Sequence, residues 1–167
     1  AGTAARFLTA YLGVSRGIYH LAASPQMRRR PMAPLLASLE DLGCEISCQG
    51  EEGHFPFTLR GRGFGKTDIS VEIEHSSQFL SALLISSCLC PEDMNIRIQG
   101  EHGLSYIRIT TRMMEQFGVS AQPWYYCEGN GENHACQGCV NSTRPLGYRV
   151  AAGQHYRALD YQVEPDV

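Results

Sequence analysis

The sequence predicts an α+β fold with mixed sheets packed on helices, because one pattern of helices and strands occurs twice. Phe7-Leu8-Thr9-Ala10 and Phe79-Leu80-Ser81-Ala82 nearly repeat each other 72 positions apart. Leu42-Gly43-Cys44 and Phe117-Gly118-Val119 are the same kind of helix end, 75 positions apart. Around these landmarks the order helix, strand, helix, strand, strand recurs, which favours parallel and antiparallel strands together. A repeat of this length is a small domain-sized unit and not one turn of a solenoid.

The elements of the first unit follow from hydrophobic spacing and from residues that end helices. Gly13 and Gly17 close the first helix, and Pro31 is a natural first residue for the second. Apolar residues then recur at three- and four-residue spacing as far as Gly43, which is typical of an amphipathic helix. Alternating apolar and polar residues predict the strands. In chain order we expect a helix over 4–12, a strand over 18–21, a loop over 24–30, a helix over 31–42 and strands over 44–48, 55–59 and 68–73.

The second unit repeats this order. We expect a helix over 77–87, a strand over 95–99, a helix over 106–116 capped by Ser105, and strands over 119–122, 148–151 and 158–163. The chain is thus interpreted as a partial single lobe, residues 1–167, with approximate repeat units 1–74 and 75–167. Because it begins without Met and stops within what resembles a connection, we expect a fragment of a longer protein.

Composition narrows the class of protein. The chain is 43% hydrophobic and 19% charged, which is ordinary for a globular protein. Its net charge of −3 and pI near 6.1 argue against a general nucleic-acid binder, because such proteins are basic. No apolar run approaches the roughly 18–20 residues that span a bilayer, and no signal peptide is visible. We therefore expect a cytoplasmic protein without nucleic-acid or membrane partners.

Seven cysteines, an odd number without a secretion signal, argue against a disulfide framework. The cysteines in or beside apolar stretches are expected to be small core residues; they are Cys44, Cys48, Cys88 and Cys90. A segment of about 127–147 is interpreted as a Cys-rich insertion. Within it Cys136-x-x-Cys139, near Cys127 and His134, has the spacing of a zinc knuckle, but only one close pair is present. The alternative is a loop with reduced thiols, and we predict no metal site.

Polar residues at helix starts are candidates for binding an anion. Arg30, the last of three consecutive arginines, precedes a helix, where its guanidinium is placed to clamp a phosphate or carboxylate. Ser76, Ser77 and Gln78 offer two hydroxyls and an amide at the start of another helix. Tyr106 opens the matching helix of the second unit. Each feature also has an ordinary interpretation, a solvated basic turn or simple helix capping, and these alternatives stay open.

Catalytic groups are not visible in the sequence. It has no pair of carboxylates suited to acid–base chemistry, no readable Ser-His-Asp or Cys-His arrangement and no phosphate-loop Gly-Lys-Ser/Thr motif. Both copies of the repeated helix begin with small or polar residues, at the end where backbone N–H groups attract anions. The residues alone therefore indicate a duplicated anion-binding unit.

Four motifs in register resemble the 5-enolpyruvylshikimate-3-phosphate synthase family. They are Ala1-Gly2-Thr3-Ala4-Ala5-Arg6, Met27-Arg28-Arg29-Arg30-Pro31-Met32, Ser76-Ser77-Gln78-Phe79-Leu80-Ser81-Ala82-Leu83-Leu84 and Tyr106-Ile107-Arg108-Ile109-Thr110. The resemblance covers residues 1–119 and 148–167. It implies an enolpyruvyl transferase lobe of repeated βαβαββ units and a transferase, EC 2.5.1 type, that needs no metal or organic cofactor. Such an enzyme moves the enolpyruvyl group of phosphoenolpyruvate to the 5-hydroxyl of shikimate 3-phosphate and releases phosphate, in the shikimate pathway to chorismate and the aromatic amino acids.

The resemblance also implies roles for particular residues. The expected contacts to shikimate 3-phosphate are those of Ser76, Ser77, Gln78 and Tyr106. The expected contacts to phosphoenolpyruvate are those of Gly2, Arg30 and Gln78. Gly2 also lies where the family's inhibitor glyphosate packs. No catalytic residue is assigned, because the family's catalytic Asp and Glu, with further Arg, His and Lys residues, lie on its other lobe. That missing second lobe is the expected partner, and the 167-residue chain alone is expected to be inactive.

The sequence departs from the family in places. Phe7 stands where Pro is frequent, and Gly103 stands at a usual Ser position, so a role for Ser105 or Gly103 stays open. A related family, UDP-N-acetylglucosamine enolpyruvyl transferase, uses a reactive Cys in the loop before the Arg-Pro helix, but residues 24–27 contain none. A non-catalytic module that binds anions or zinc is the remaining alternative.

Overall fold

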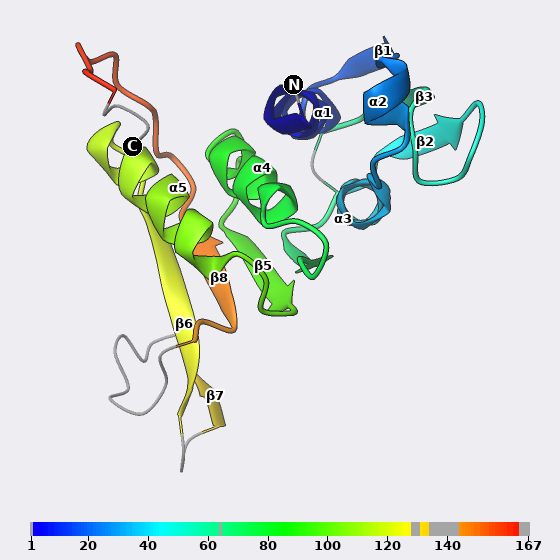
Figure 1. The fold of residues 1–167 in the computed structure, drawn as a ribbon. Helices are drawn as coiled ribbons and strands as arrows, with labels where there is room; N and C mark the ends of the chain where they lie inside the picture. Colours follow the sequence, from blue (N-terminus) through cyan, green and yellow to red (C-terminus); the bar gives the residue numbers. More distant parts are fainter. Residues whose placement is uncertain (1, 64, 128–130, 134–143, 164–167) are drawn as a thin grey trace.

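The computed structural model describes residues 2–63, 65–127, 131–133 and 144–163 (Figure 1). Its helices are α1 (Gly2–Val14), α2 (Pro25–Arg28), α3 (Ala33–Asp41), α4 (Gln78–Ser87) and α5 (Leu104–Gln116). Its strands are β1 (Gly17–Leu21), β2 (Glu45–Cys48), β3 (Phe57–Gly61), β4 (Asp68–Glu72), β5 (Met94–Gln99), β6 (Ala121–Cys127), β7 (Gly131–Asn133) and β8 (Gly147–Val150). The expected α+β class, with helices packed on mixed sheets, is confirmed.

The strands form two sheets with a shared topology. The first has the order β1-β3-β2, with β3 antiparallel to both neighbours. The second has the order β4-β5-β8-β6-β7, with β8 antiparallel to β5 and β6. In each sheet the last strand of a unit therefore lies between the two strands that precede it, apart from the short β7 at the edge of the second sheet.

Strand β4 belongs to the second sheet, because it pairs with β5 in parallel. A parallel pair needs a crossover connection, and α4 supplies it. From β4 onward the order β4-α4-β5-α5-β6-β8 has the βαβαββ pattern, with β7 as an addition. A boundary drawn from strand pairing thus lies before β4 and not at residue 75, so the units 1–74 and 75–167 remain an approximate division.

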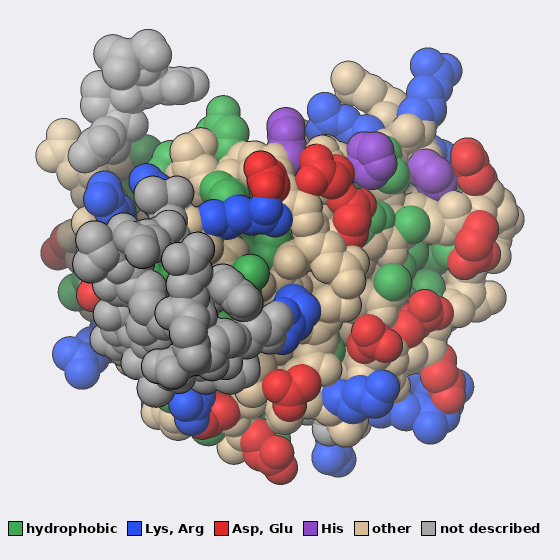
Figure 2. Space-filling view, turned by 90° about the horizontal axis from the view of Figure 1, so that it is seen from below, with side chains coloured by type: hydrophobic (Ala, Val, Ile, Leu, Met, Phe, Trp, Pro, Cys, Tyr) green, Lys and Arg blue, Asp and Glu red, His purple; other side chains and the backbone are tan. Residues whose placement is uncertain are grey.

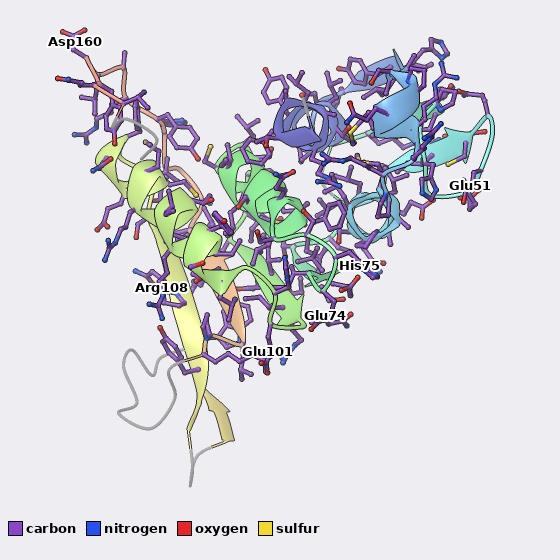
Figure 3. All side chains as sticks on the ribbon, viewed as in Figure 1. Glu51, Glu74, His75, Glu101, Arg108 and Asp160 are labelled. Atoms are coloured by element: carbon purple, nitrogen blue, oxygen red, sulfur yellow. The ribbon has the colours of Figure 1, made fainter. Side chains whose placement is uncertain are left out.

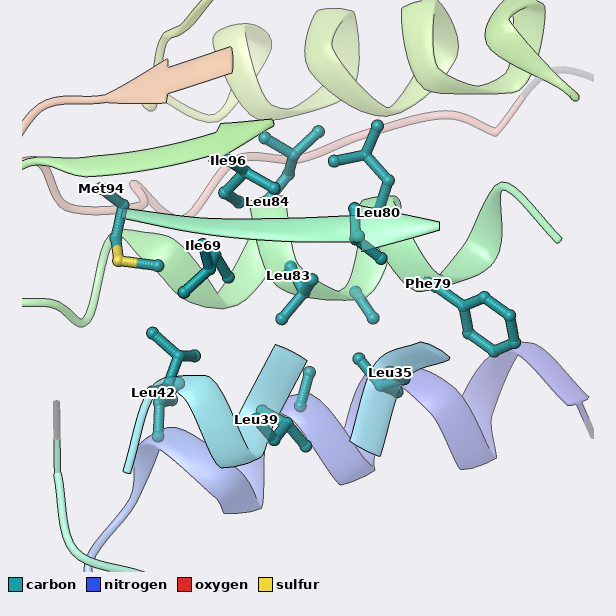
Figure 4. Packing of buried hydrophobic residues seen from close by; sticks show 14 of the residues in the cluster. Leu35, Leu39, Leu42, Ile69, Phe79, Leu80, Leu83, Leu84, Met94 and Ile96 are labelled. Carbon is teal, nitrogen blue, oxygen red and sulfur yellow. The ribbon is translucent and has the colours of Figure 1, made fainter. Parts of the chain in front are cut away.

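The main core lies where α3 and α4 meet the second sheet. Helix α3 packs on β4, and α4 packs on β4, β5 and β8 while also contacting α1. Figure 4 shows Leu35 and Leu39 of α3 facing Leu83 of α4 and Ile69 of β4. Eight of the ten residues of α4 are buried, which is expected of a helix that is apolar on all sides.

The predicted helices are present, but two connections differ from expectation. The loop over 24–30 contains α2, whose first turn is capped where the Ser24 hydroxyl accepts a hydrogen bond from the backbone N–H of Met27 (3.4 Å). The predicted strand over 158–163 is wrong, because this segment has no ladder partner within the described ranges and runs irregularly beside the end of α5. Its apolar residues are exposed, and Tyr161 packs its ring against Phe117. Alternating apolar and polar residues do not form a strand unless a neighbouring strand is available for backbone hydrogen bonds.

The structure describes the four cysteines that were expected in the core, but not the candidate zinc knuckle. The four cysteines expected in the core are free thiols, of which three are buried and Cys48 is half-buried. Burial raises the pKa of Cys44 to about 11, and its thiol donates to the carbonyl oxygen of Gly13 (3.1 Å). The proposed zinc knuckle with Cys136, Cys139 and His134 lies outside the described residues.

The surface carries both signs of charge, interspersed on the face shown in Figure 2. Exposed ion pairs among the described residues include Arg149 with Asp93 and Arg62 with Glu45. None of the helices within the described ranges combines the length and the apolar character that a bilayer-spanning segment needs.

Candidate functional site

The starts of α1, α4 and α5, together with the turn before α3, lie side by side. The first link is between α1 and α4, where the amide nitrogen of Gln78 donates to the hydroxyl of Thr3 (3.1 Å). The second joins α4 to α5, where Gly103 lies against Ser77. The third joins the turn before α3 to α1, where Arg30 lies against Gly2. Because each helix start presents the positive end of its dipole, this convergence favours an anion.

Gly2 gives the guanidinium of Arg30 access to the backbone of α1. A Cβ atom built on Gly2 would lie 2.4 Å from Nη1 of Arg30 and 3.9 Å from Nη1 of Arg6. Any side chain at this position would therefore displace Arg30. The side chain of Arg30 is exposed and makes no ion pair with the described residues. Two guanidinium groups thus flank Gly2, and no carboxylate in the described part of the chain forms an ion pair with either of them.

At the start of α4, the hydroxyls of Ser76 and Ser77 have different roles. The hydroxyl of Ser76 accepts from the backbone N–H of Gln78 (3.2 Å), so Ser76 caps the first turn. Ser77 is the backbone N-cap residue, but its side chain makes no capping bond. Its hydroxyl also has no other hydrogen-bond partner among the described residues, although the residue is only 7% exposed. The hydroxyl oxygen is not among the fully buried unpaired atoms, so it reaches the surface and is available to a ligand oxygen.

Gly103, and not Ser105, caps α5. Its φ of 70° is left-handed, a conformation that glycine adopts without the cost of a Cβ atom. A Cβ atom at Gly103 would also lie 2.7 Å from the hydroxyl oxygen of Ser77. This close approach and the left-handed backbone explain why glycine suits position 103. The ring of Tyr106 lies beside Gly103 and is 65% exposed, so it borders the site near Ser77.

Acidic residues in the two preceding loops hold α4 and α5 in this arrangement. The carboxylate of Glu74, just before α4, accepts from the backbone N–H of Glu101, just before α5 (2.9 Å). The guanidinium of Arg144 pairs with Glu101 and donates to the carbonyl oxygen of Gly100 (2.8 Å). Figure 3 shows Glu74, His75 and Glu101 grouped at this end of the second sheet. These contacts fix the loops, so Ser77 and Gly103 stay adjacent.

Arg6 is a central residue of this site to which the sequence analysis gave no role. It is 6% exposed, and its Nη1 donates to the amide oxygen of Gln78 (2.7 Å) and to the hydroxyl of Ser76 (3.3 Å). Its guanidinium also lies 4.9 Å from the ring centroid of Phe79. The repeat contained a signal for this contact, since Arg6 and Gln78 occupy equivalent positions in the two copies of the repeated helix.

Arg6 is a buried cation without a carboxylate partner among the described residues. Burial, and then the like charge of Arg30, lower the pKa of Arg6. Its Nε atom is buried without a hydrogen-bond partner among the described residues. No carboxylate forms an ion pair with Arg6 within the same ranges. A bound anion would relieve this local excess of positive charge.

The assembled groups are suited to holding an anion rather than to proton transfer. They comprise two guanidinium groups, hydroxyls and one amide, and none of the residues predicted for the site is a carboxylate or a histidine. Among the described residues no cluster of three His, Cys, Asp or Glu side chains is placed to hold a metal ion. A separate cavity of about 390 Å³, lined by Lys66, Asp68 and Arg97 among others, contains none of the site residues.

The chain is similar to known proteins over most of its length. The family model of EPSP synthase (3-phosphoshikimate 1-carboxyvinyltransferase) matches residues 1–143. The 3-phosphoshikimate 1-carboxyvinyltransferase of Trichormus variabilis is 34% identical over 167 residues, which cover 99% of this chain and 35% of that protein. The protein of the same description from Salmonella heidelberg is 42% identical over 127 residues, which cover 75% of this chain and 30% of that protein.

Solved structures give the same fold. An EPSP synthase structure from Acinetobacter baumannii matches with a TM-score of 0.63 and 19% identity, over 93% of this chain and 29% of that chain. At this identity the match speaks for the fold alone. The chain spans about 35% of the length of the curated relatives it matches over its whole length.

Proposed function

We propose, because this chain belongs to the EPSP synthase family, that it supplies part of the substrate site of an enolpyruvyl transferase. The reaction moves the enolpyruvyl group of phosphoenolpyruvate to the 5-hydroxyl of shikimate 3-phosphate and releases phosphate. The observation that carries the proposal is the convergence of Gly2 and Arg30 with Ser77 and Gln78 at neighbouring helix starts. Residues from two repeat units form one anion-binding surface there.

Shikimate 3-phosphate is assigned to the α4 and α5 side of this surface. The unpartnered hydroxyl of Ser77 suits a phosphate oxygen, and the hydroxyl of Ser76 retains a hydrogen to donate after accepting from Arg6 and Gln78. The exposed ring of Tyr106 borders the same place and offers a flat face to the carbocycle. Hydroxyls and an aromatic face together suit a phosphorylated, hydroxylated ring.

Phosphoenolpyruvate is assigned to the α1 side. The guanidinium of Arg30 is a bidentate donor for a carboxylate or phosphate, and Gly2 leaves the space in which it lies. Gln78 stands between the two sides and is placed to touch both substrates. Holding two anions together lowers the entropic barrier to their reaction, and positive groups nearby offset their mutual repulsion.

The 167-residue chain alone is proposed to be inactive, because its candidate site binds anions and offers no proton donor or acceptor matched to the reaction. A second lobe of the same enzyme is the proposed partner, and the cytoplasm is the proposed location. Turnover of phosphoenolpyruvate with shikimate 3-phosphate by this chain would contradict the first statement. The transferase activity of the chain is measured by following phosphate release with both substrates and with each substrate left out.

The site assignment is tested by titrating the ¹⁵N-labelled chain with shikimate 3-phosphate and, separately, with phosphoenolpyruvate. Ser77→Ala is expected to weaken the binding of shikimate 3-phosphate by about tenfold, because one hydrogen bond to a charged group is lost. Arg30→Ala is expected to weaken the binding of phosphoenolpyruvate by at least as much. Unchanged affinity in both variants would refute the assignment.

Two control variants separate local contacts from general effects. Arg29→Ala removes the same charge from the adjacent, exposed residue, and Ser120→Ala removes an exposed hydroxyl before β6. Both are expected to keep the affinities of the original chain. A loss with Arg29→Ala equal to that with Arg30→Ala would mean that net charge, and not the placement of Arg30 beside Gly2, determines binding.

A further inference from the structure

Arg6 contacts the amide of Gln78 in a way that determines which end of that amide faces outward. A guanidinium has donors only, so the atom that it contacts at 2.7 Å must be the amide oxygen. The reversed amide would place an NH₂ group against Nη1, donor against donor. The amide nitrogen therefore faces Thr3, at the side where Gly2 and Arg30 lie.

The amide nitrogen of Gln78 keeps one N–H available. One of its two N–H groups donates to the hydroxyl of Thr3 (3.1 Å), and the second has no partner among the described residues. Nη1 of Arg6 also contacts the hydroxyl oxygen of Ser76, so one buried guanidinium holds two candidate ligand-binding side chains at once. Its Nη2 reaches the carbonyl oxygen of Pro31 (3.4 Å), which ties the arrangement to the turn that carries Arg30.

We propose that Arg6 is a positioning residue that orients Gln78 as a hydrogen-bond donor toward the bound anion. This inference rests on the proposed function, because it takes Gln78 as a ligand contact. A neutral acceptor suits position 78 for a further reason. It holds Arg6 in place without cancelling its charge, whereas a carboxylate there would pair with Arg6, remove the donor and repel an anion.

A double-mutant cycle tests the coupling between the two residues. Arg6→Met and Gln78→Met are each expected to weaken phosphoenolpyruvate binding by about tenfold, and the double variant by clearly less than the product of the two losses. The losses fall short of multiplying because part of the effect of Arg6 acts through Gln78. Losses that multiply in the double variant would overturn the inference. Arg29→Met, which removes an exposed neighbouring charge, is the control for net charge.

Gln78→Glu separates positioning from simple structural support. The glutamate keeps and strengthens the contact with Arg6, so the chain is expected to resist urea at least as well as the original. Phosphoenolpyruvate binding is nevertheless expected to fall by tenfold or more, because the donor is replaced by a negative charge. Retained binding in Gln78→Glu would overturn the inference.

The ligand-free chain supplies a readout that does not depend on the proposed function. ¹⁵N relaxation of the side-chain NH₂ group of Gln78 is expected to report an ordered amide in the original chain and a mobile one in Arg6→Met. An amide that stays ordered in Arg6→Met would contradict the positioning role. If the original chain binds neither substrate, the proposed function fails, while the relaxation result still decides whether Arg6 orders Gln78.

Discussion

The two repeat units contribute different chemistry to the same surface. The first supplies the cations Arg6 and Arg30, and the second supplies neutral groups, among them Ser77 and Gln78. Arg6 and Gln78 are equivalent positions, 72 residues apart, and they are hydrogen-bonded to each other. Two arginines in these places would repel, and two glutamines would leave no charge. Equivalent positions of the repeated pattern thus lie together, and the different residue at each of them makes the pair complementary.

The equivalent helices α1 and α4 also differ in burial. Helix α4 lies between α1, α3 and the second sheet, and Leu80 is fully buried. The equivalent Leu8 of α1 is 57% exposed, and Tyr11 is 52% exposed. The leucine of this short sequence therefore lies in the core in one copy and at the surface in the other, although Thr9 and Ala10 of α1 are buried. Neighbouring elements, and not the residues themselves, decide which.

The largest expected effect comes from this contrast. Leu80→Ala is expected to lower the free energy of unfolding by about 2–5 kcal/mol, because it leaves a cavity in the core. Leu8→Ala, at the equivalent exposed position, is expected to change it by less than about 0.5 kcal/mol. Urea unfolding of both variants measures the difference. Equal losses would show that α1 and α4 are buried to a similar extent.

The next effect concerns the start of α5. Gly103→Ser is expected to cost about 2–4 kcal/mol, the sum of a left-handed backbone and a displaced Ser77 side chain. Gly153→Ser is the matched control, because Gly153 has a φ of +76° but nothing within 4 Å of its Cβ position. Gly153→Ser is expected to lower the free energy of unfolding only by the cost of the left-handed backbone, about 1–2 kcal/mol. If both variants unfold at the same urea concentration, the contact between Gly103 and Ser77 has no energetic weight.

A smaller effect distinguishes Cys44 from Val119, its equivalent in the second unit. Burial raises the pKa of the Cys44 thiol from 9.0 to about 11, so the folded state keeps a proton that the unfolded state loses. Its contribution to stability is full below pH 9 and declines as the pH rises toward 11. Between pH 8 and pH 10 the free energy of unfolding is expected to fall by about 1 kcal/mol because of Cys44. In Cys44→Val this part of the fall is expected to be absent. An unchanged pH profile of urea unfolding would contradict this.

The smallest effect on stability is expected at Gly2. Gly2→Ala replaces glycine in a helix, so the free energy of unfolding should change by less than about 1 kcal/mol and should not fall. Its Cβ atom would nevertheless displace the flexible end of Arg30, so phosphoenolpyruvate affinity is expected to drop severalfold. Calorimetric titration beside urea unfolding separates the two. A large fall in the free energy of unfolding would show that Gly2 is needed for folding and not mainly for ligand binding.

Hydrophobic spacing predicted the helices and most strands, because burial of one face imposes its period on the residues. The start of α5 was predicted two residues late, since a left-handed glycine cap leaves no polar signal like that of Ser105. Residues 158–163 alternate like a strand but are not paired as one, because pairing depends on a neighbour that local sequence does not contain. The candidates Gly2, Arg30, Ser77 and Gln78 came from motifs and lie together.

By itself the sequence determined the repeated unit, the α+β class and the helix starts that carry polar residues. These depend on local periodicity and on backbone preferences within a few residues. Only the tertiary structure decided that Arg6 contacts Gln78, that Gly103 touches Ser77, and that Leu80 is buried while the equivalent Leu8 is exposed. Such contacts join residues far apart in the chain, and their energies depend on distances and burial that arise only when the two units pack together.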